Sequence, residues 1–170
     1  MKSILMSKPP KQVANILNGK QTILITKTAP KCGLPVTVYI YCTKRGVAIE
    51  KDLGLGFPEP INGRVVAKFT LTEVEELKPF SLMKMLGEDL TEKQAEIADK
   101  ACMGWLGIHI YADGKSVYLW HISDLVVFDE PKKLENFYST PKKINGLYGA
   151  EMVNISLSKS PRSWCYVEEN

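Results

Sequence analysis

A glycine turn near the start of the chain brings together residue types that can hold an anion. Apolar side chains recur at helical spacing over residues 13–17, and Gly19 follows them as a helix C-cap, because glycine adopts the left-handed conformation without steric cost. The β-branched run 22–27 then predicts a strand. A helix end at such a turn leaves backbone N–H groups unpaired. Together with Lys20 and Lys27, these donors can bind a phosphate or another oxyanion.

Aromatic residues in the second half of the chain suit a nucleic-acid base. Trp120, Trp164 and Tyr166 offer flat apolar surfaces, and stacking on such surfaces tolerates any base. His121 can form a hydrogen bond with a base edge. The alternative for the three aromatic residues is a place in the apolar core. The alternative for His121 is a partly buried histidine whose hydrogen bonds are satisfied within the protein.

The charge of the chain is distributed unevenly. The net charge is +3, yet residues 1–49 contain eight lysine and arginine residues, Lys44 among them, and no acid. Such an asymmetry indicates an anionic partner. The alternative is that folding interleaves these lysines with acids from the rest of the chain.

Composition and motifs exclude several classes of protein. A chain of 170 residues with 45% apolar content predicts a single globular domain over 1–170. No apolar run is long enough to span a bilayer, and no signal peptide is recognisable, so we expect a cytoplasmic protein without a membrane partner. The four cysteines lack zinc-site spacing, and nucleotide-binding and hydrolase motifs are absent. We therefore expect no metal, no cofactor and no catalytic residue. Cys42 and Cys165 are expected in the core, and Cys32 is expected as an exposed loop thiol.

Hydrophobic periodicity predicts many short strands and few helices. Strands are predicted over 3–7, 22–27, 36–43, 64–74, 105–111, 116–122, 125–128, 153–157 and 164–167. Helices are predicted over 9–18 and from a capping box at Thr91 towards Met103. Residues 112–115 are predicted as a hairpin turn, 30–35 and 46–63 as loops, 130–137 as a surface turn or short helix, and 139–147 as irregular chain. This pattern predicts an α+β fold built on a mixed β-barrel.

The turn and the strand after it resemble the signature of the ASCH family, whose pattern is G-x-K-x-x-E-x-R. Gly19 matches the family glycine, whereas Gln21, Leu24 and Thr26 stand at the positions of the lysine, glutamate and arginine. Alternation along the strand places Leu24 and Thr26 on the same face as Thr22.

Three further segments resemble ASCH proteins, the last of them those of phages and Gram-positive bacteria. Residues 38–44 resemble the strand after the signature, 119–125 a later strand and turn, and 161–169 the C-terminal strand. In the last segment Arg162 replaces a glutamine that is common in those proteins. The four segments run nearly from end to end of the chain, in the family's order.

The resemblance implies a PUA-like mixed β-barrel with flanking helices, and a module that binds RNA or a nucleotide without catalysing a reaction. Its pocket is expected to be neutral where the family pocket is charged. The candidate ligand-binding residues are Gly19, Lys20, Gln21, Thr22, Leu24, Thr26, Lys27, Lys44, Trp120, His121, Arg162, Trp164 and Tyr166.

Two alternatives remain open at the level of sequence. One branch of the family resembles amidohydrolases that act on acylated cytidine, with a lysine and a threonine from this strand and a distant glutamate. Gln21 and Leu24 occupy those lysine and threonine positions here, and neither side chain can replace the family residue chemically. The other alternative is a phage accessory protein that binds a host protein.

Overall fold

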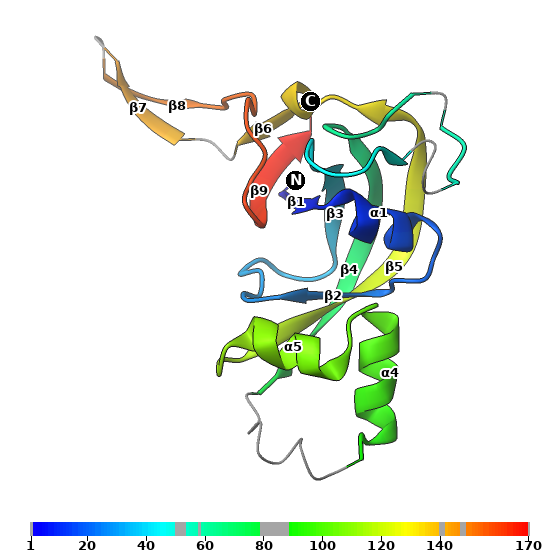
Figure 1. The fold of residues 1–170 in the computed structure, drawn as a ribbon. Helices are drawn as coiled ribbons and strands as arrows, with labels where there is room; N and C mark the ends of the chain where they lie inside the picture. Colours follow the sequence, from blue (N-terminus) through cyan, green and yellow to red (C-terminus); the bar gives the residue numbers. More distant parts are fainter. Residues whose placement is uncertain are drawn as a thin grey trace.

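The chain folds into a mixed β-sheet with helices packed against it (Figure 1). The computed structural model describes residues 2–49, 54–57, 59–78, 89–139, 142–146 and 149–169. The strands are β1 (Ser3–Lys8), β2 (Ile23–Thr26), β3 (Val36–Cys42), β4 (Val65–Leu77), β5 (Val117–Lys132), β6 (Phe137–Ser139), β7 (Lys142–Gly146), β8 (Gly149–Val153) and β9 (Trp164–Glu169). The helices are α1 (Pro10–Leu17), α4 (Glu92–Lys100), α5 (Trp105–Ala112) and the 3-10 helix η1 (Leu134–Asn136). These elements confirm the predicted α+β class.

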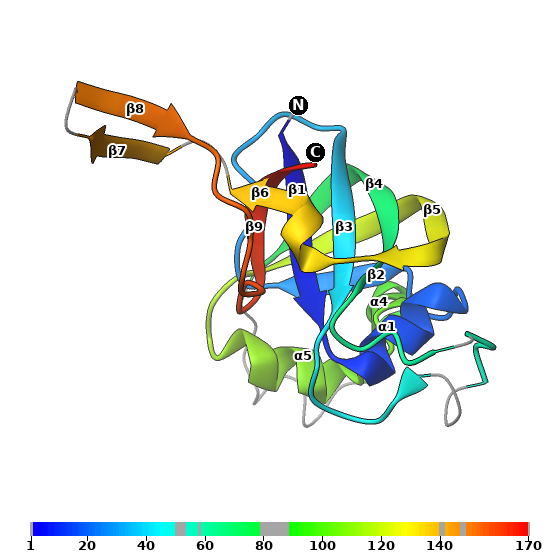
Figure 2. The ribbon, with the colours of Figure 1, turned by 90° about the horizontal axis from the view of Figure 1, so that it is seen from above.

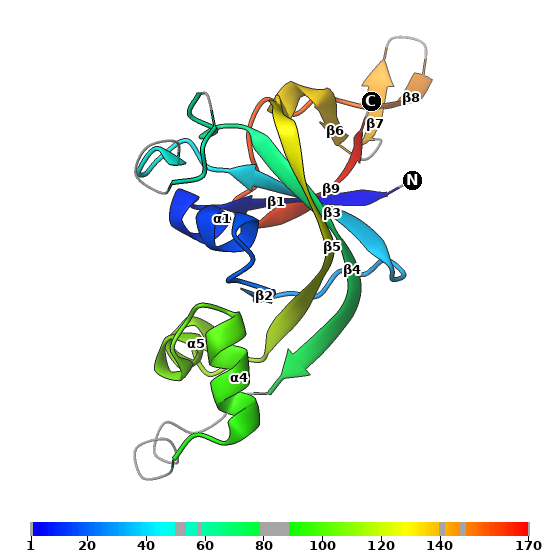
Figure 3. The ribbon, with the colours of Figure 1, turned by 90° about the vertical axis from the view of Figure 1, so that its right-hand side faces the viewer.

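The main sheet is open rather than closed. Its seven strands lie in the order β2-β5-β4-β3-β1-β9-β6, in which β1 and β3 are parallel and all other neighbours are antiparallel. Within the described residues no backbone ladder joins β2 to β6 or to β9. The sheet is strongly curved, but it does not close into the predicted mixed β-barrel (Figure 3).

The lengths of the strands explain why the sheet does not close. β4 and β5 have 13 and 16 residues, and register shifts along their pairing bend them away from β1 and β3 (Figure 3). β2 has only four residues and pairs with the early part of β5. Closing a barrel requires consecutive ladders around the whole sheet. The short strand β2, at the edge of the bent β4–β5 pair, does not form the further ladder that would close the sheet.

Helix α1 confirms the sequence prediction for the N-terminal segment. Pro10 occupies its first position, where a missing N–H costs little. Val13 and Ile16 are buried, and Leu17 packs against the same core cluster. Gly19 has a φ of +75°, the left-handed conformation expected after the helix end.

The predicted strand at 105–111 is wrong, because these residues form helix α5. Trp105, Ile108 and Ala112 are buried at helical spacing against β2, β5 and α4. Asp113 caps the helix with a φ of +52°, so residues 112–115 end a helix and do not turn a hairpin. The sequence is apolar on every side of α5, with Leu106 and Ile110 exposed, so periodicity could not distinguish helix from strand.

The C-terminal third also differs from the prediction in places. The strands predicted over 116–122 and 125–128 are one strand, β5, which continues through a residue with positive φ at Asp124. The segment predicted as irregular contains β7, which forms a separate hairpin with β8 that projects from the sheet (Figure 2). Residues 155–157 pair with β6 instead of forming a longer strand. Residues 50–53 and 58 of the predicted loop 46–63 lie outside the described part of the chain.

Three apolar clusters stabilise the fold. The largest lies between α1 and the concave side of the sheet and includes Leu24, Cys42 and Trp120. The second joins α4 and α5 to β2 and β5. The third lies on the other side of β1 and β3, where Cys165 packs against it. Cys42 and Cys165 are thus in or against the core as predicted, whereas Cys32, expected as exposed, is half-buried against the first cluster. No described helix is long and apolar enough to cross a membrane.

Candidate functional site

Several of the predicted residues meet at the open side of the sheet, between β2 and β9. Trp164 of β9 donates a hydrogen bond from Nε1 to Thr28 Oγ1 at 3.1 Å, and the Lys31 backbone N–H donates to the Tyr166 hydroxyl at 2.7 Å. These bonds join β9 to the segment that follows β2. We call Thr26, Thr28, Lys31, Trp164 and Tyr166 the β2–β9 seam. The seam is held by side-chain hydrogen bonds where a closed barrel would have a backbone ladder.

An aromatic cluster lies behind the seam. The Trp164 ring centroid is 5.4 Å from that of Trp120 and 5.4 Å from that of Tyr166, with the rings tilted or edge-on. Trp120 is fully buried and belongs to the core, as the alternative interpretation expected for all three aromatics. Trp164 and Tyr166 are only half-buried. Part of each of these two rings is therefore accessible from the seam.

The indole N–H of Trp120 is buried without a hydrogen-bond partner in the described part of the chain. Leu24 is the residue directly opposite Trp120 on β2, and it offers only carbon atoms. Burying an unpaired donor costs about 1–3 kcal/mol. A ligand atom that accepts from this N–H would recover that cost.

The residues at the signature positions are buried and uncharged. Leu24 is 0% exposed and Thr26 is 1% exposed, and the Thr26 hydroxyl donates to the Thr28 carbonyl at 2.8 Å. Gln21 is also buried, and its Nε2 donates to the Ile23 carbonyl at 3.2 Å. The strand therefore presents neither a base nor a free hydroxyl at these positions.

The glycine turn does not have the free backbone donors that the sequence suggested. The N–H groups of Gly19, Gln21 and Thr22 donate to carbonyl oxygens within the protein, and the N–H of Lys20 donates to Asn18 Oδ1 at 3.1 Å. The backbone N–H groups from Gly19 to Thr22 thus all have acceptors within the protein, three of them nearby in the sequence and one, at Lys100, in α4. An oxyanion site built on these N–H groups is not assembled.

The predicted cations are spread over different surfaces. Lys20 is exposed, and Lys27 lies over the ring of Tyr111 in α5 at 5.1 Å. Lys2 lies over the ring of Tyr166, 5.6 Å from its centroid, and so adds a positive charge beside the seam. Sequence reasoning did not select Lys2, although it belongs to the acid-free region that was singled out.

His121 and Arg162 do not join the aromatic cluster. His121 pairs with Ile23, next to the Trp120–Leu24 pair, so its side chain points to the opposite face of the sheet. There its Nε2 lies 4.0 Å from Glu75, which also contacts Lys93 at 2.6 Å. Arg162 is exposed in the segment before β9. This geometry separates His121 from the aromatic cluster, and its hydrogen bond with a base edge stays a prediction.

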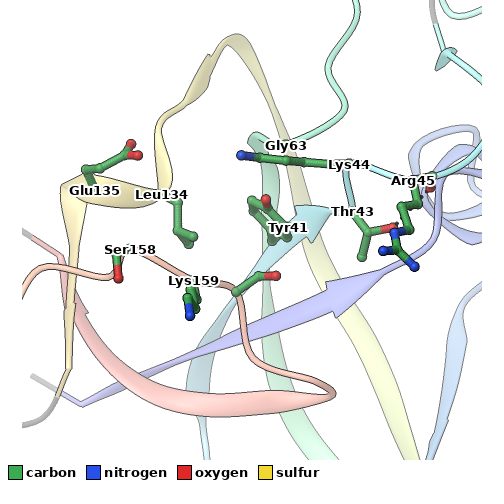
Figure 4. A pocket seen from close by; sticks show the side chains of 10 residues that line it. Tyr41, Thr43, Lys44, Arg45, Gly63, Leu134, Glu135, Ser158 and Lys159 are labelled. Carbon is green, nitrogen blue, oxygen red and sulfur yellow. Dashed lines mark hydrogen bonds between the residues drawn. The ribbon is translucent and has the colours of Figure 1, made fainter.

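Lys44 lies away from the seam, in a groove where β3 ends and β4 begins. Three hollows of about 510, 570 and 520 Å³ share lining residues there. The first and second hollows share Lys44, Gly63 and Glu135, and the second and third share Arg64 and Lys133. We call the first two hollows the cationic groove; its basic residues are Lys44, Arg45, Arg64, Lys133 and Lys159. Figure 4 shows those of the first hollow, which are Lys44, Arg45 and Lys159. Of these, only Lys44 was among the predicted binding residues.

The titratable groups give no sign of a reactive thiol or a metal site. Burial raises the pKa of Cys42 to about 12 and also raises the pKa of Cys165, so both thiols stay protonated at neutral pH. Among the described residues, no group of three or more histidine, cysteine, aspartate or glutamate side chains is arranged to hold a metal ion.

Comparison with solved structures relates this fold to an ASCH protein. The chain aligns with ASCH from Zymomonas mobilis at a TM-score of 0.53 and 13% sequence identity, over 98% of this chain and 87% of that chain. Two mutant forms of the Zymomonas protein align at TM-scores of 0.48 and 0.47, with 14% and 17% identity, over 98% and 79% of this chain and 88% and 77% of theirs. No protein-family model matches the sequence, and no curated protein matches it. The alignment to the first structure shows an ASCH-like fold.

Proposed function

We propose that this protein is a non-catalytic module that binds RNA or a nucleotide, and that a base enters at the β2–β9 seam. The observation that carries the proposal is the pair of half-buried rings, Trp164 and Tyr166, at a side of the sheet where the described residues form side-chain hydrogen bonds and no backbone ladder. Such rings can stack on a base at modest cost, because only two hydrogen bonds need rearrange.

The surroundings of these rings favour a polar, anionic ligand over an apolar one. The Trp120 N–H is a buried donor without an acceptor among the described residues, and base carbonyls and ring nitrogens are acceptors. Lys2 lies at the Tyr166 ring and supplies positive charge for a phosphate. A nucleotide therefore offers both complementary groups: its base can accept a hydrogen bond from Trp120, and its phosphate can pair with Lys2.

The test is a titration of mononucleotides followed by tryptophan fluorescence. Trp164→Ala is expected to weaken binding roughly 5- to 100-fold, because base stacking contributes about 1–3 kcal/mol per base. Trp105→Phe is the matched control, since Trp105 lies in the separate α4–α5 cluster and should leave the affinity unchanged. Unchanged affinity in a folded Trp164→Ala variant, or the same loss in both variants, would contradict binding at the seam.

We also expect no hydrolysis of acylated cytidine by the purified protein. Gln21 cannot act as a base, Leu24 has no hydroxyl, and the hydroxyl of Thr26 is engaged with the Thr28 carbonyl. The measurement is chromatography of acetylated cytidine after incubation, with Gln21→Lys/Leu24→Thr as a variant in which trace activity is conceivable chemically. Robust turnover by the unmodified protein that Lys20→Ala abolishes would instead establish an enzyme.

A further inference from the structure

The cationic groove collects positive charge from four separate segments of the chain. Lys44 and Arg45 follow β3, Arg64 precedes β4, Lys133 precedes η1, and Lys159 precedes β9. Figure 4 shows Tyr41 within the first hollow, with Lys44 and Gly63 on one side and Lys159 on another. Convergence of these segments is a property of the folded sheet, because they are far apart in the sequence.

The groove has an excess of cations that the described residues do not neutralise. Glu135 is the one acid that lines the first two hollows. None of the five basic residues lies within 4.0 Å of a carboxylate among the described residues. Like charges gathered in a concave surface repel one another and focus a positive potential into it. A bound anion would relieve this repulsion, so anion binding in the groove is expected to be favourable.

Local structure holds the groove in shape. Gly63 has a φ of +83°, and a Cβ at this position would lie 3.1 Å from Lys44 Cγ, so the Lys44 stem rests directly on the glycine. The Gly63 N–H donates to the Cys42 carbonyl at 2.8 Å, and the Cys42 N–H donates to the Arg64 carbonyl at 2.9 Å. These bonds fix Lys44 and Arg64 on neighbouring turns at the ends of β3 and β4.

Neutral hydrogen-bonding groups accompany the cations in the first hollow. Thr43, Ser158 and Ser160 contribute hydroxyl groups, and the Tyr41 hydroxyl interacts with Ser160. Burial raises the pKa of Tyr41, so its hydroxyl remains protonated and brings no negative charge to the site. Lysine, arginine and hydroxyl groups are the partners that proteins use for phosphate oxygens.

We propose that the cationic groove binds the phosphate backbone of single-stranded RNA, as a site separate from the β2–β9 seam. The proposal deepens the proposed function and rests on it for the choice of RNA. The two adjoining hollows, of about 510 and 570 Å³, place several cations along one concave surface, where a flexible single strand can bring successive phosphates to them. A duplex is convex and stiff, so it would reach the rim of such hollows but not the cations within them. The third hollow is also lined by Glu59, Asp129 and Glu130, which repel phosphate groups. The surface that favours a phosphate backbone therefore ends at Arg64 and Lys133.

The test is fluorescence anisotropy with a labelled oligouridylate of roughly 10 nucleotides. Affinity is measured between about 50 and 200 mM salt, because each phosphate contact to a single strand adds about 0.7 to the slope of log affinity against log salt. Lys44→Gln/Arg64→Gln/Lys159→Gln is expected to reduce that slope by about 2 and to lower affinity at 0.1 M salt on the order of a hundredfold.

The matched control is Lys11→Gln/Lys78→Gln/Lys115→Gln, which removes the same charge from exposed positions outside both the groove and the seam. This variant should keep the slope of the unmodified protein. An equal loss of slope in both variants, or an unchanged slope in the groove variant, would overturn the proposal. Equal affinity for duplex RNA or for polyglutamate would overturn the assignment to single-stranded RNA.

The two sites can fail independently. If Trp164→Ala leaves the mononucleotide affinity unchanged while the groove variant has a reduced salt slope, the proposed binding at the seam is wrong and the proposed binding in the groove is supported. If Trp164→Ala weakens mononucleotide binding and the groove variant has the same salt slope as the unmodified protein, the proposed function is supported and RNA binding in the groove is wrong.

Discussion

Leu24→Glu is expected to lower the free energy of unfolding by about 3–5 kcal/mol, the cost of a buried charge without a partner. Leu24 is 0% exposed, and the position where the ASCH signature has an arginine holds Thr26, which is uncharged and 1% exposed. A carboxylate placed at Leu24 therefore finds no counter-charge on its strand. Its one polar neighbour across the ladder is Trp120, whose indole N–H can donate at most one hydrogen bond.

The pH dependence of this variant identifies the cause. Burial would raise the pKa of the new carboxyl above its ordinary value of about 4.3, so the folded state would bind a proton that the unfolded state has released. The deficit relative to the unmodified protein should therefore grow as pH rises from about 5 to 8. Urea unfolding measures it, with Leu24→Met as the control that retains volume and should cost less than about 1.5 kcal/mol. A deficit that is independent of pH would assign the loss to packing alone.

Lys8→Met is expected to stabilise the protein at pH 7 by about 1–3 kcal/mol, because Lys8 carries a charge into a largely buried position. Burial lowers the pKa of Lys8 from 10.5 to about 8, and none of the described acids forms an ion pair with it. The residue keeps some contact with water, so the gain should not exceed what this shift in pKa implies.

The sign of the effect follows from the two pKa values. Between pH 8 and 10.5 the unfolded chain holds a proton on Lys8 that the folded protein has lost, so the unmodified protein becomes more stable as pH rises through this range. The advantage of Lys8→Met is therefore largest below pH 8 and disappears towards pH 10.5. Lys11→Met, an equal change at an exposed position of α1, should show neither the gain nor its pH dependence. A constant gain over the whole range would show that the Lys8 charge is not the cause.

Elements that depend on contacts between residues close in the sequence were predictable from the sequence. The turn at Gly19 and helix α1 follow from a proline start, an apolar stripe and a glycine end. The capping box at Thr91 forms as predicted, with Gln94 N–H donating to Thr91 Oγ1 at 3.2 Å and Thr91 N–H donating to Gln94 Oε1 at 2.9 Å. Alternation along β2 also agrees with the structure: Leu24 packs in the first apolar cluster, whereas Ile23 and Ile25 pack in the second.

Features that depend on distant contacts were decided by the tertiary structure. Helix α5 was mistaken for a strand because its sequence is apolar on all sides, and only packing against α4 and the sheet selects the face of Trp105 and Ile108. The resemblance to a barrel family could not show that the sheet stays open. Closure depends on whether β2 meets β9 through a ladder, and here side chains from Trp164 and Tyr166 take that place.

The sequence by itself determined which residue types are available: an acid-free, basic first third, a neutral signature strand and three aromatic residues suited to stacking. The tertiary structure decided which of them meet. It set Lys2 beside Tyr166, turned His121 to the opposite face and gathered Lys44 with Arg64, Lys133 and Lys159. The physical reason is the range of the forces involved. Caps and strand alternation are set by bonds between near neighbours, whereas a binding surface depends on sheet curvature and register, to which the whole chain contributes.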